Sequence, residues 1–204
     1  MILKPDGTPF QQHLLTSTQD VIRRFPESLK PEIYALSFRI WRIDYDERHP
    51  YVAIGYNTET QCGEQTNPED PGEARWNYAS WLLDGFEMLG NVPEDPVGSP
   101  LYVDEVKRAG LWFDGEYDFL AADLPEDEED ELDAKSDLLR LHFYDACIAL
   151  ARHLHTDGHL TEILGRPLPI VVFDMDCPGW EIEATEAANP PELIADYLAW
   201  QKST

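Results

Sequence analysis

The sequence predicts an α+β fold, in which an antiparallel central β-sheet is flanked by helices and residues 1–204 form a single acidic domain. Two alternating apolar segments separated by turn residues predict a β-hairpin, and several segments with apolar residues three or four apart predict helices. The 204 residues fit one core, and 43% hydrophobic residues supply enough apolar surface to offset chain entropy. A folded chain is therefore expected.

The first predicted helix begins at Thr8 and Pro9, a cap and first-turn pair, and ends before Pro26. Its apolar stripe is Phe10, Leu14, Thr18, Val21, Ile22 and Phe25. The hairpin follows. Residues 32–44 alternate with apolar residues on both faces, which predicts a central strand, and residues 51–58 form the returning strand after the turn residues DYDERHP.

The middle of the chain is less regular. Residues 59–72 are rich in Glu, Asn, Pro, Gly and Asp, which predicts a loop. The aromatic group Trp76, Tyr78 and Trp81, with the LLDGFEML segment after it, fits a third strand or an extended packing segment. A short helix is predicted at residues 101–112, after the helix-breaking segment Gly-Ser-Pro.

The most helical segment follows an acidic run, EDEEDELD, at residues 126–133. Carboxylates in a first helical turn are favoured by the helix dipole, so part of this run has a structural reason. The apolar stripe of the helix is Leu139, Phe143, Cys147, Leu150 and Leu154, and Gly158 can end it.

The C-terminal part predicts a short helix, a buried strand and a last helix. The helix covers residues 160–164 and closes at Gly165, and the strand is LPIVVF at 168–173. Residues 180–184 are expected to pair back on this strand. The last helix, after Pro190 and Pro191, carries Leu193, Ile194, Tyr197, Leu198 and Trp200.

The net charge of −25, from 40 Asp and Glu against 15 Lys and Arg, limits the possible partners. Phosphate backbones and anionic lipids are bound through Lys and Arg, so neither a nucleic acid nor a membrane is an expected partner. The same field speeds encounter with a basic protein. A plainer interpretation is that acidic surfaces keep cytoplasmic proteins soluble.

A cytoplasmic protein is expected for two further reasons. The N-terminus lacks a basic region followed by an apolar region, and no segment approaches the ~18 apolar residues of a membrane span. Cys62, Cys147 and Cys177 are odd in number and far apart, which predicts neither disulfides nor a cysteine zinc site.

The strongest enzyme-like motif is FDMD at residues 173–176, directly after an apolar strand. Two carboxylates at a strand end can serve as nucleophile and acid in magnesium-dependent phosphoryl transfer, and the motif resembles the opening motif of haloacid-dehalogenase-type phosphatases. Here Cys177 and Pro178 follow instead of that family's small residues, and too few residues remain for its fold. The alternative function is therefore a small metal-dependent hydrolase that uses Asp174 and Asp176.

Metal-binding patterns are weaker still. His153, His155 and His159 surround a helix end, but positions two apart do not share a helix face. Asp44, Asp46 and Glu47 lack the glycine and glutamate spacing of a calcium loop. We therefore predict no catalytic residue, no metal and no cofactor.

Two groups of residues are candidates for binding a partner protein. Exposed tryptophans are frequent anchors at interfaces, although aromatic groups are more often core, and acidic runs can steer a basic partner. The predicted partner-binding residues are Glu126, Asp127, Glu128, Glu129, Asp130, Glu131, Trp76 and Trp81.

Several segments carry a family resemblance. IYALSFRIW, VAIGYNTET and EARWNYASW in the first half, and the VVFDMD strand and Trp200 in the second, resemble a bacterial family catalogued as a domain of unknown function (four-three-zero-three). Some of its members look like immunity proteins of polymorphic toxin systems. The resemblance implies an antitoxin, not an enzyme, that binds and neutralises a cognate secreted toxin, and the acidic charge suits a basic toxin domain.

Overall fold

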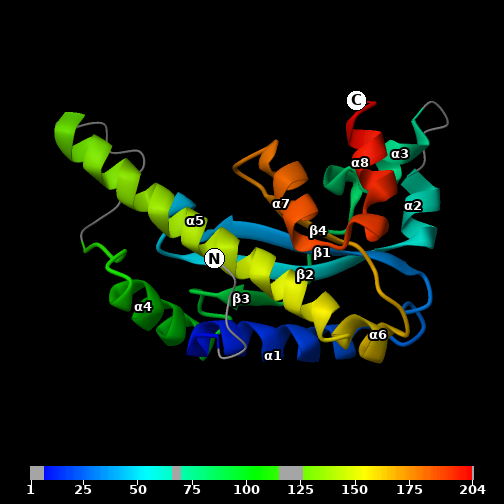
Figure 1. The fold of residues 1–204 in the computed structure, drawn as a ribbon, viewed down its shortest axis with the longest axis horizontal. Coiled ribbons are helices and arrows are strands. Elements are labelled where there is room, and N and C mark those ends of the chain that lie inside the picture. Colours follow the sequence, from blue (N-terminus) through cyan, green and yellow to red (C-terminus); the bar gives the residue numbers. More distant parts are fainter. Residues whose placement is uncertain (1–6, 66–69, 115–125, 204) are drawn as a thin grey trace.

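A four-stranded sheet with the order β3-β2-β1-β4 organises the chain (Figure 1). The computed structural model describes residues 7–65, 70–114 and 126–203, with the side chains of the last range described from Asp130 onward. Strand β1 (Ile33–Arg42) pairs antiparallel with β2 (Pro50–Thr58) and parallel with β4 (Ile170–Asp174), and β3 (Met88–Gly90) pairs antiparallel with β2. The sheet is mixed but mostly antiparallel, and the predicted α+β class is confirmed.

Side chains along a strand alternate between the two faces of the sheet, so both faces here carry apolar side chains. Helices cover both faces. Leu36, Phe38 and Ile40 of β1 point to one core, and Val171 and Phe173 of β4 point to another. The first core is covered by α1 (Pro9–Arg23), α4 (Gly98–Arg108), α5 (Glu126–Thr156) and α6 (His159–Leu164). The second is covered by α2 (Glu59–Gln65), α3 (Pro71–Trp76) and α8 (Ala195–Gln201), which lie across the sheet from α1 (Figure 1).

Helix α1 begins with the cap that its sequence predicts. The Thr8 hydroxyl accepts a hydrogen bond from the Gln11 backbone N–H at 3.2 Å, and the Gln11 side chain accepts one from the Thr8 N–H at 3.0 Å. Such a capping box satisfies two N–H groups that a helix start leaves without partners. Phe10, Leu14 and Ile22 of this helix are almost completely buried, so the predicted first helix is confirmed.

The hairpin between β1 and β2 turns on two successive left-handed residues. Asp44 has φ 53° and Tyr45 has φ 59°, and the Asp46 N–H donates to the Ile43 carbonyl at 2.9 Å. Two left-handed residues in succession match the twist of antiparallel strands, but an aromatic residue adopts this conformation only with strain. The predicted hairpin is confirmed, with an unusual residue at its tip.

The outer edge of β4 is covered by α7 (Trp180–Ala188). The Thr185 hydroxyl accepts from the Val172 N–H at 3.0 Å, and the Asn189 amide accepts from the Ile170 N–H at 2.8 Å and donates to the Ile170 carbonyl at 2.7 Å. These two side chains lie one helical turn apart on the same face of the helix. They supply hydrogen bonds to the β4 backbone that a further strand would otherwise supply.

Two expectations were wrong, and a third was right only in part. Residues 180–184 form part of helix α7 and do not pair with β4 as a strand, because Gly179 (φ 96°) turns the chain and small alanines let the helix approach the sheet. Residues 59–72 include α2 and the start of α3, where Asp70 caps Glu73 N–H at 3.0 Å. Trp76 ends a helix, but the third strand, Met88–Gly90, includes the last two residues of the LLDGFEML segment, so the expectation of a third strand there holds in part.

The remaining predicted elements are confirmed. The short helix predicted at 101–112 is α4, which begins earlier, at Gly98, and ends at Arg108. The long apolar stripe is α5, and the C-terminal elements are α6, β4 and α8, with a 3₁₀ turn η3 (Pro191–Leu193) before α8. Two further 3₁₀ turns are η1 (Ile43–Tyr45) and η2 (Tyr78–Ser80). Within the described residues, no helix is long and apolar enough to cross a membrane.

Candidate functional site

A buried ionic cluster lies where the two parallel strands end. Arg42 is the last residue of β1 and Asp174 the last of β4, and the carboxyl ends of parallel strands meet at the same edge of a sheet. The Arg42 guanidinium donates to the carboxylates of Asp174 and, at 2.7 Å, of Asp176. The side chains of Arg42 and Asp174 are 5% and 0% exposed, so this pair is shielded from water.

Asp174 is buried and accepts three hydrogen bonds from within the protein. Its Oδ2 accepts hydrogen bonds from Arg42 and, at 2.5 Å, from the Tyr144 hydroxyl, and its Oδ1 accepts from the Asp176 N–H at 2.7 Å. The Tyr144 ring stacks on Trp180 with centroids 3.7 Å apart. Burial and the neighbouring Asp174 raise the pKa of Tyr144, so this hydroxyl stays a hydrogen-bond donor.

Glu47 completes the cluster from the hairpin loop. Its Oε2 is 3.0 Å from Arg42 Nε, although the Nε–H is not aimed at it, and its Oε1 is 3.5 Å from Arg140 Nη1 of α5. Burial raises the pKa of Glu47 to about 7, and the two guanidinium groups oppose that shift. Glu47 therefore exchanges its proton near neutral pH.

The structure thus brings Asp174 and Asp176 together, as the FDMD motif suggests, but with partners that the motif does not reveal. Arg42 balances the charge of Asp174 and Tyr144 donates a hydrogen bond to it, whereas a catalytic nucleophile must reach its substrate. Sequence reasoning missed both partners. The one available signal was an arginine at the end of an otherwise apolar strand, because a buried charge needs an opposite charge beside it.

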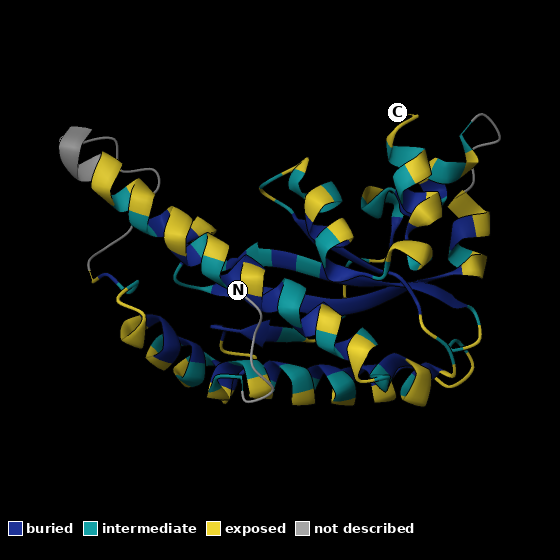
Figure 2. Ribbon diagram, in the orientation of Figure 1, coloured by how far each residue is buried: buried dark blue, intermediate teal, exposed yellow. Residues whose placement is uncertain are grey.

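The acidic run lies at the start of α5. Figure 1 shows this end of the helix extending beyond the sheet, and Figure 2 shows its described surface largely exposed. Asp130 and Glu131 are exposed, and Glu131 accepts from Lys135 at 2.7 Å, which lowers the pKa of the Glu131 carboxyl. The side chains of the other predicted partner-binding acids, at 126–129, lie outside the described residues.

The two tryptophans predicted to bind a partner are buried. Trp76 packs edge-on against Tyr34 with centroids 5.9 Å apart, and Trp81 Nε1 donates to the Arg75 carbonyl at 3.1 Å. Helix α3, which ends at Trp76, and the start of α5 lie at opposite ends of the long axis (Figure 1). The structure therefore does not bring the two predicted groups together, and contact through these rings would require local opening.

The three histidines near the end of α5 have partners within the protein. His155 Nε2 lies 3.1 Å from Asn189 Oδ1, and burial lowers the His155 pKa. His153 and His159 lie 3.5 and 3.7 Å from the same oxygen of Asp157. Among the residues that the structure describes, no group of three His, Cys, Asp or Glu could hold a metal ion.

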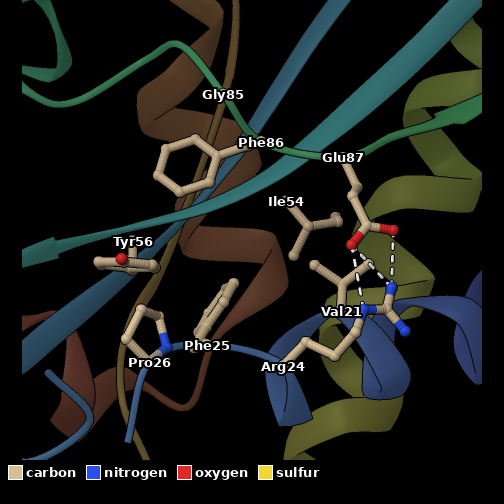
Figure 3. A pocket seen from close by; sticks show the side chains of 9 residues that line it. All are labelled: Val21, Arg24, Phe25, Pro26, Ile54, Tyr56, Gly85, Phe86 and Glu87. Carbon is tan, nitrogen blue, oxygen red and sulfur yellow. Dashed lines mark hydrogen bonds and ion pairs between the residues drawn. The ribbon is translucent and has the colours of Figure 1, made fainter. Parts of the chain in front are cut away.

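A small pocket of about 260 Å³ lies between the end of α1, strand β2 and residues 85–87 (Figure 3). Phe25, Tyr56 and Phe86 line it, and Arg24 pairs with Glu87 across its rim at 2.6 Å. Small-molecule sites typically span ~300–1,000 Å³, so this pocket is smaller than most of them. It is therefore not assigned a function.

Comparisons of the chain with protein-family models, with curated proteins and with solved structures give no match. The family resemblance therefore stays a prediction.

Proposed function

We propose that this chain is an immunity-type protein that binds and neutralises a cognate bacterial secreted toxin and catalyses no reaction. The exposed acidic surface of α5, on a chain of net charge −25, is the observation that carries the proposal. Such a surface attracts a basic protein over a Debye length of ~8–10 Å. The family resemblance supplies the class of partner, and protection of the producing cell places the protein in the cytoplasm.

The pairing of Asp174 supports binding over the hydrolase alternative. A hydrolase needs one carboxylate that reaches the substrate, yet Asp174 is buried with three hydrogen-bond donors around it. An assay with p-nitrophenyl phosphate and Mg²⁺ separates the two functions. Phosphatase activity that disappears in both Asp174→Asn and Asp176→Asn would establish the alternative and end the binding-only proposal.

Growth rescue tests the proposal directly. The C-terminal domain of the protein encoded beside this chain should arrest growth when expressed alone in a bacterial host, and co-expression of this chain should restore growth. The two purified proteins should then co-elute in size-exclusion chromatography. Growth arrest that this chain does not relieve, with no complex, would contradict the proposal for that pair.

A further inference from the structure

The exposed apolar side chains of the described residues are unevenly distributed. Five large ones are exposed: Tyr45, Leu82, Val97, Leu138 and Leu141. Three of these five belong to α5 and to the hairpin loop that α5 contacts. Single exposed apolar residues are ordinary on a protein surface, whereas a group of them marks a contact surface.

Leu138 and Leu141 occupy the solvent side of α5. They are 52% and 54% exposed, while Leu139 and Phe143 of the same helix are buried in the core. Residues three apart are neighbours on a helix surface, so the two leucines form one apolar patch directed away from the sheet. Packing of the core does not account for leucine at these two positions.

The hairpin loop that contacts α5 carries a strained aromatic residue. The ion pair between Arg140 and Glu47 holds the loop against α5, on a side of the helix that Leu138 does not share, because residues two apart do not face each other. Tyr45 is 56% exposed and has φ 59°, a conformation that costs a bulky residue of order 1–3 kcal/mol. Backbone strain of this kind concentrates at functional surfaces, where the side chain it presents is needed.

Acidic side chains border the leucines along the helix. Asp130, Glu131, Asp133, Asp137 and Asp145 are all exposed, and residues 130–145 span about 24 Å at ~1.5 Å per residue. The two cations of this stretch pair with its acids, Lys135 with Glu131 at 2.7 Å and Arg140 with Asp137. Five acids against two cations leave the margins of the patch negative.

We infer that this face of α5, centred on Leu138 and Leu141, is the docking surface for a basic amphipathic helix of the partner protein. The inference rests on the proposed function and names the surface that would perform it. A helix with apolar residues three and four apart packs against the two leucines, and its flanking Lys and Arg meet the acids on either side. A membrane or nucleic acid would be repelled by the same acids.

A defined peptide tests the surface without the toxin. The probe is a synthetic helix with leucines on one face and lysines on the other, and its control replaces every lysine by glutamate. Calorimetry should show binding of the lysine peptide only. Leu138→Ser with Leu141→Ser should weaken binding at least about tenfold, because two leucines lose their buried contact area.

The matched control is Leu82→Ser with Val97→Ser, which removes two equally exposed apolar side chains outside this region and should leave the affinity unchanged. Circular dichroism and thermal midpoints should be the same for all variants. Failure of the lysine peptide to bind, equal binding of the glutamate peptide, or equal loss in both serine pairs would overturn the docking surface.

The toxin experiment separates this inference from the proposed function. If the wild-type chain neutralises the toxin and Leu138→Ser with Leu141→Ser does so with equal affinity, the surface is wrong and the function stands. If the lysine peptide binds through the leucines but the toxin is not neutralised, the surface stands and the toxin is not its partner.

Discussion

Arg140 of helix α5 lies 3.5 Å from Glu47 of the hairpin loop, and Glu47 in turn lies 3.0 Å from Arg42 at the end of β1. This chain of charges joins the exposed acidic helix to the buried ends of the sheet. The side chains of Glu47 and Arg42 are less than a tenth exposed, so water screens their interaction only weakly. These ion pairs therefore connect helix α5, which carries the proposed docking surface, to a buried carboxyl, Glu47, that titrates.

Stability should depend on pH through Glu47. Its folded pKa of about 7 lies above the ordinary value of 4.5, so between these values the folded state binds a proton that the unfolded state does not. The contribution of Glu47 to stability is therefore largest below pH ~4.5 and is lost as the pH rises through about 7. A shift of this size corresponds to roughly 3 kcal/mol in the free energy of unfolding.

Glu47→Gln isolates this effect, because glutamine resembles the protonated carboxyl at every pH. The difference in free energy of unfolding between Glu47→Gln and wild type should grow in favour of the variant from pH ~5 to ~8 in urea denaturation. A difference that does not change with pH would show that Glu47 keeps one charge state across this range.

Asp174→Asn should destabilise the protein strongly. It removes the most deeply buried of the three carboxylates that pair with Arg42, and breaking a buried pair in this way costs about 3–5 kcal/mol. Asp176→Asn is the matched control, since the Asp176 side chain is 27% exposed and should cost less than about 1 kcal/mol. Similar losses for both variants in urea denaturation would mean that the cluster does not depend on Asp174.

The cover over the edge of β4 should depend on Asn189. All four hydrogen-bonding positions of its amide are used, by Ile170 N–H and carbonyl, the Thr185 carbonyl and His155. Asn189→Ala leaves buried backbone groups without partners, at about 1–3 kcal/mol for each. Chemical denaturation should show this loss, whereas the exposed Glu186→Ala on the same helix should change stability by less than about 0.5 kcal/mol. Equal effects would contradict the edge-covering role.

Gly98 should not tolerate a side chain. A Cβ there would lie 2.0 Å from Asp95 Oδ2, and Asp95 accepts hydrogen bonds from the N–H groups of Gly90 and Gly98 and pairs with His13 at 2.8 Å. Gly98→Ala should lower stability by at least about 2 kcal/mol, because it displaces that carboxylate. Gly63→Ala meets nothing within 4 Å in α2 and should be neutral or stabilising by thermal unfolding. A neutral Gly98→Ala would mean that Asp95 moves without cost.

Elements with a strong apolar period could be predicted from the sequence. The alternation of β1 and the stripe through Leu139, Phe143 and Cys147 each report a buried face, and burial dominates stability over a whole element. Helices α2 and α3 were missed because they are only seven and six residues long, and their Glu, Gly and Pro content is also that of a loop.

The candidate site was harder to predict because its contacts are distant in sequence. Arg42 and Asp174 lie 132 positions apart, and their pairing depends on the parallel placement of β4 beside β1. The helix α7 was mistaken for a strand for a related reason, since Thr185 and Asn189 supply the edge bonds that a strand would supply. The local sequence pattern does not distinguish a strand that pairs with the edge of β4 from a helix whose side chains hydrogen-bond to the backbone of that edge.

The central claim, that an acidic surface binds a basic partner, is tested most directly by the salt dependence of association. Stopped-flow measurement with the toxin domain should give an association rate constant that falls at least about tenfold between about 20 mM and about 200 mM NaCl. The dissociation rate should change far less. An association rate that does not depend on salt would contradict the account.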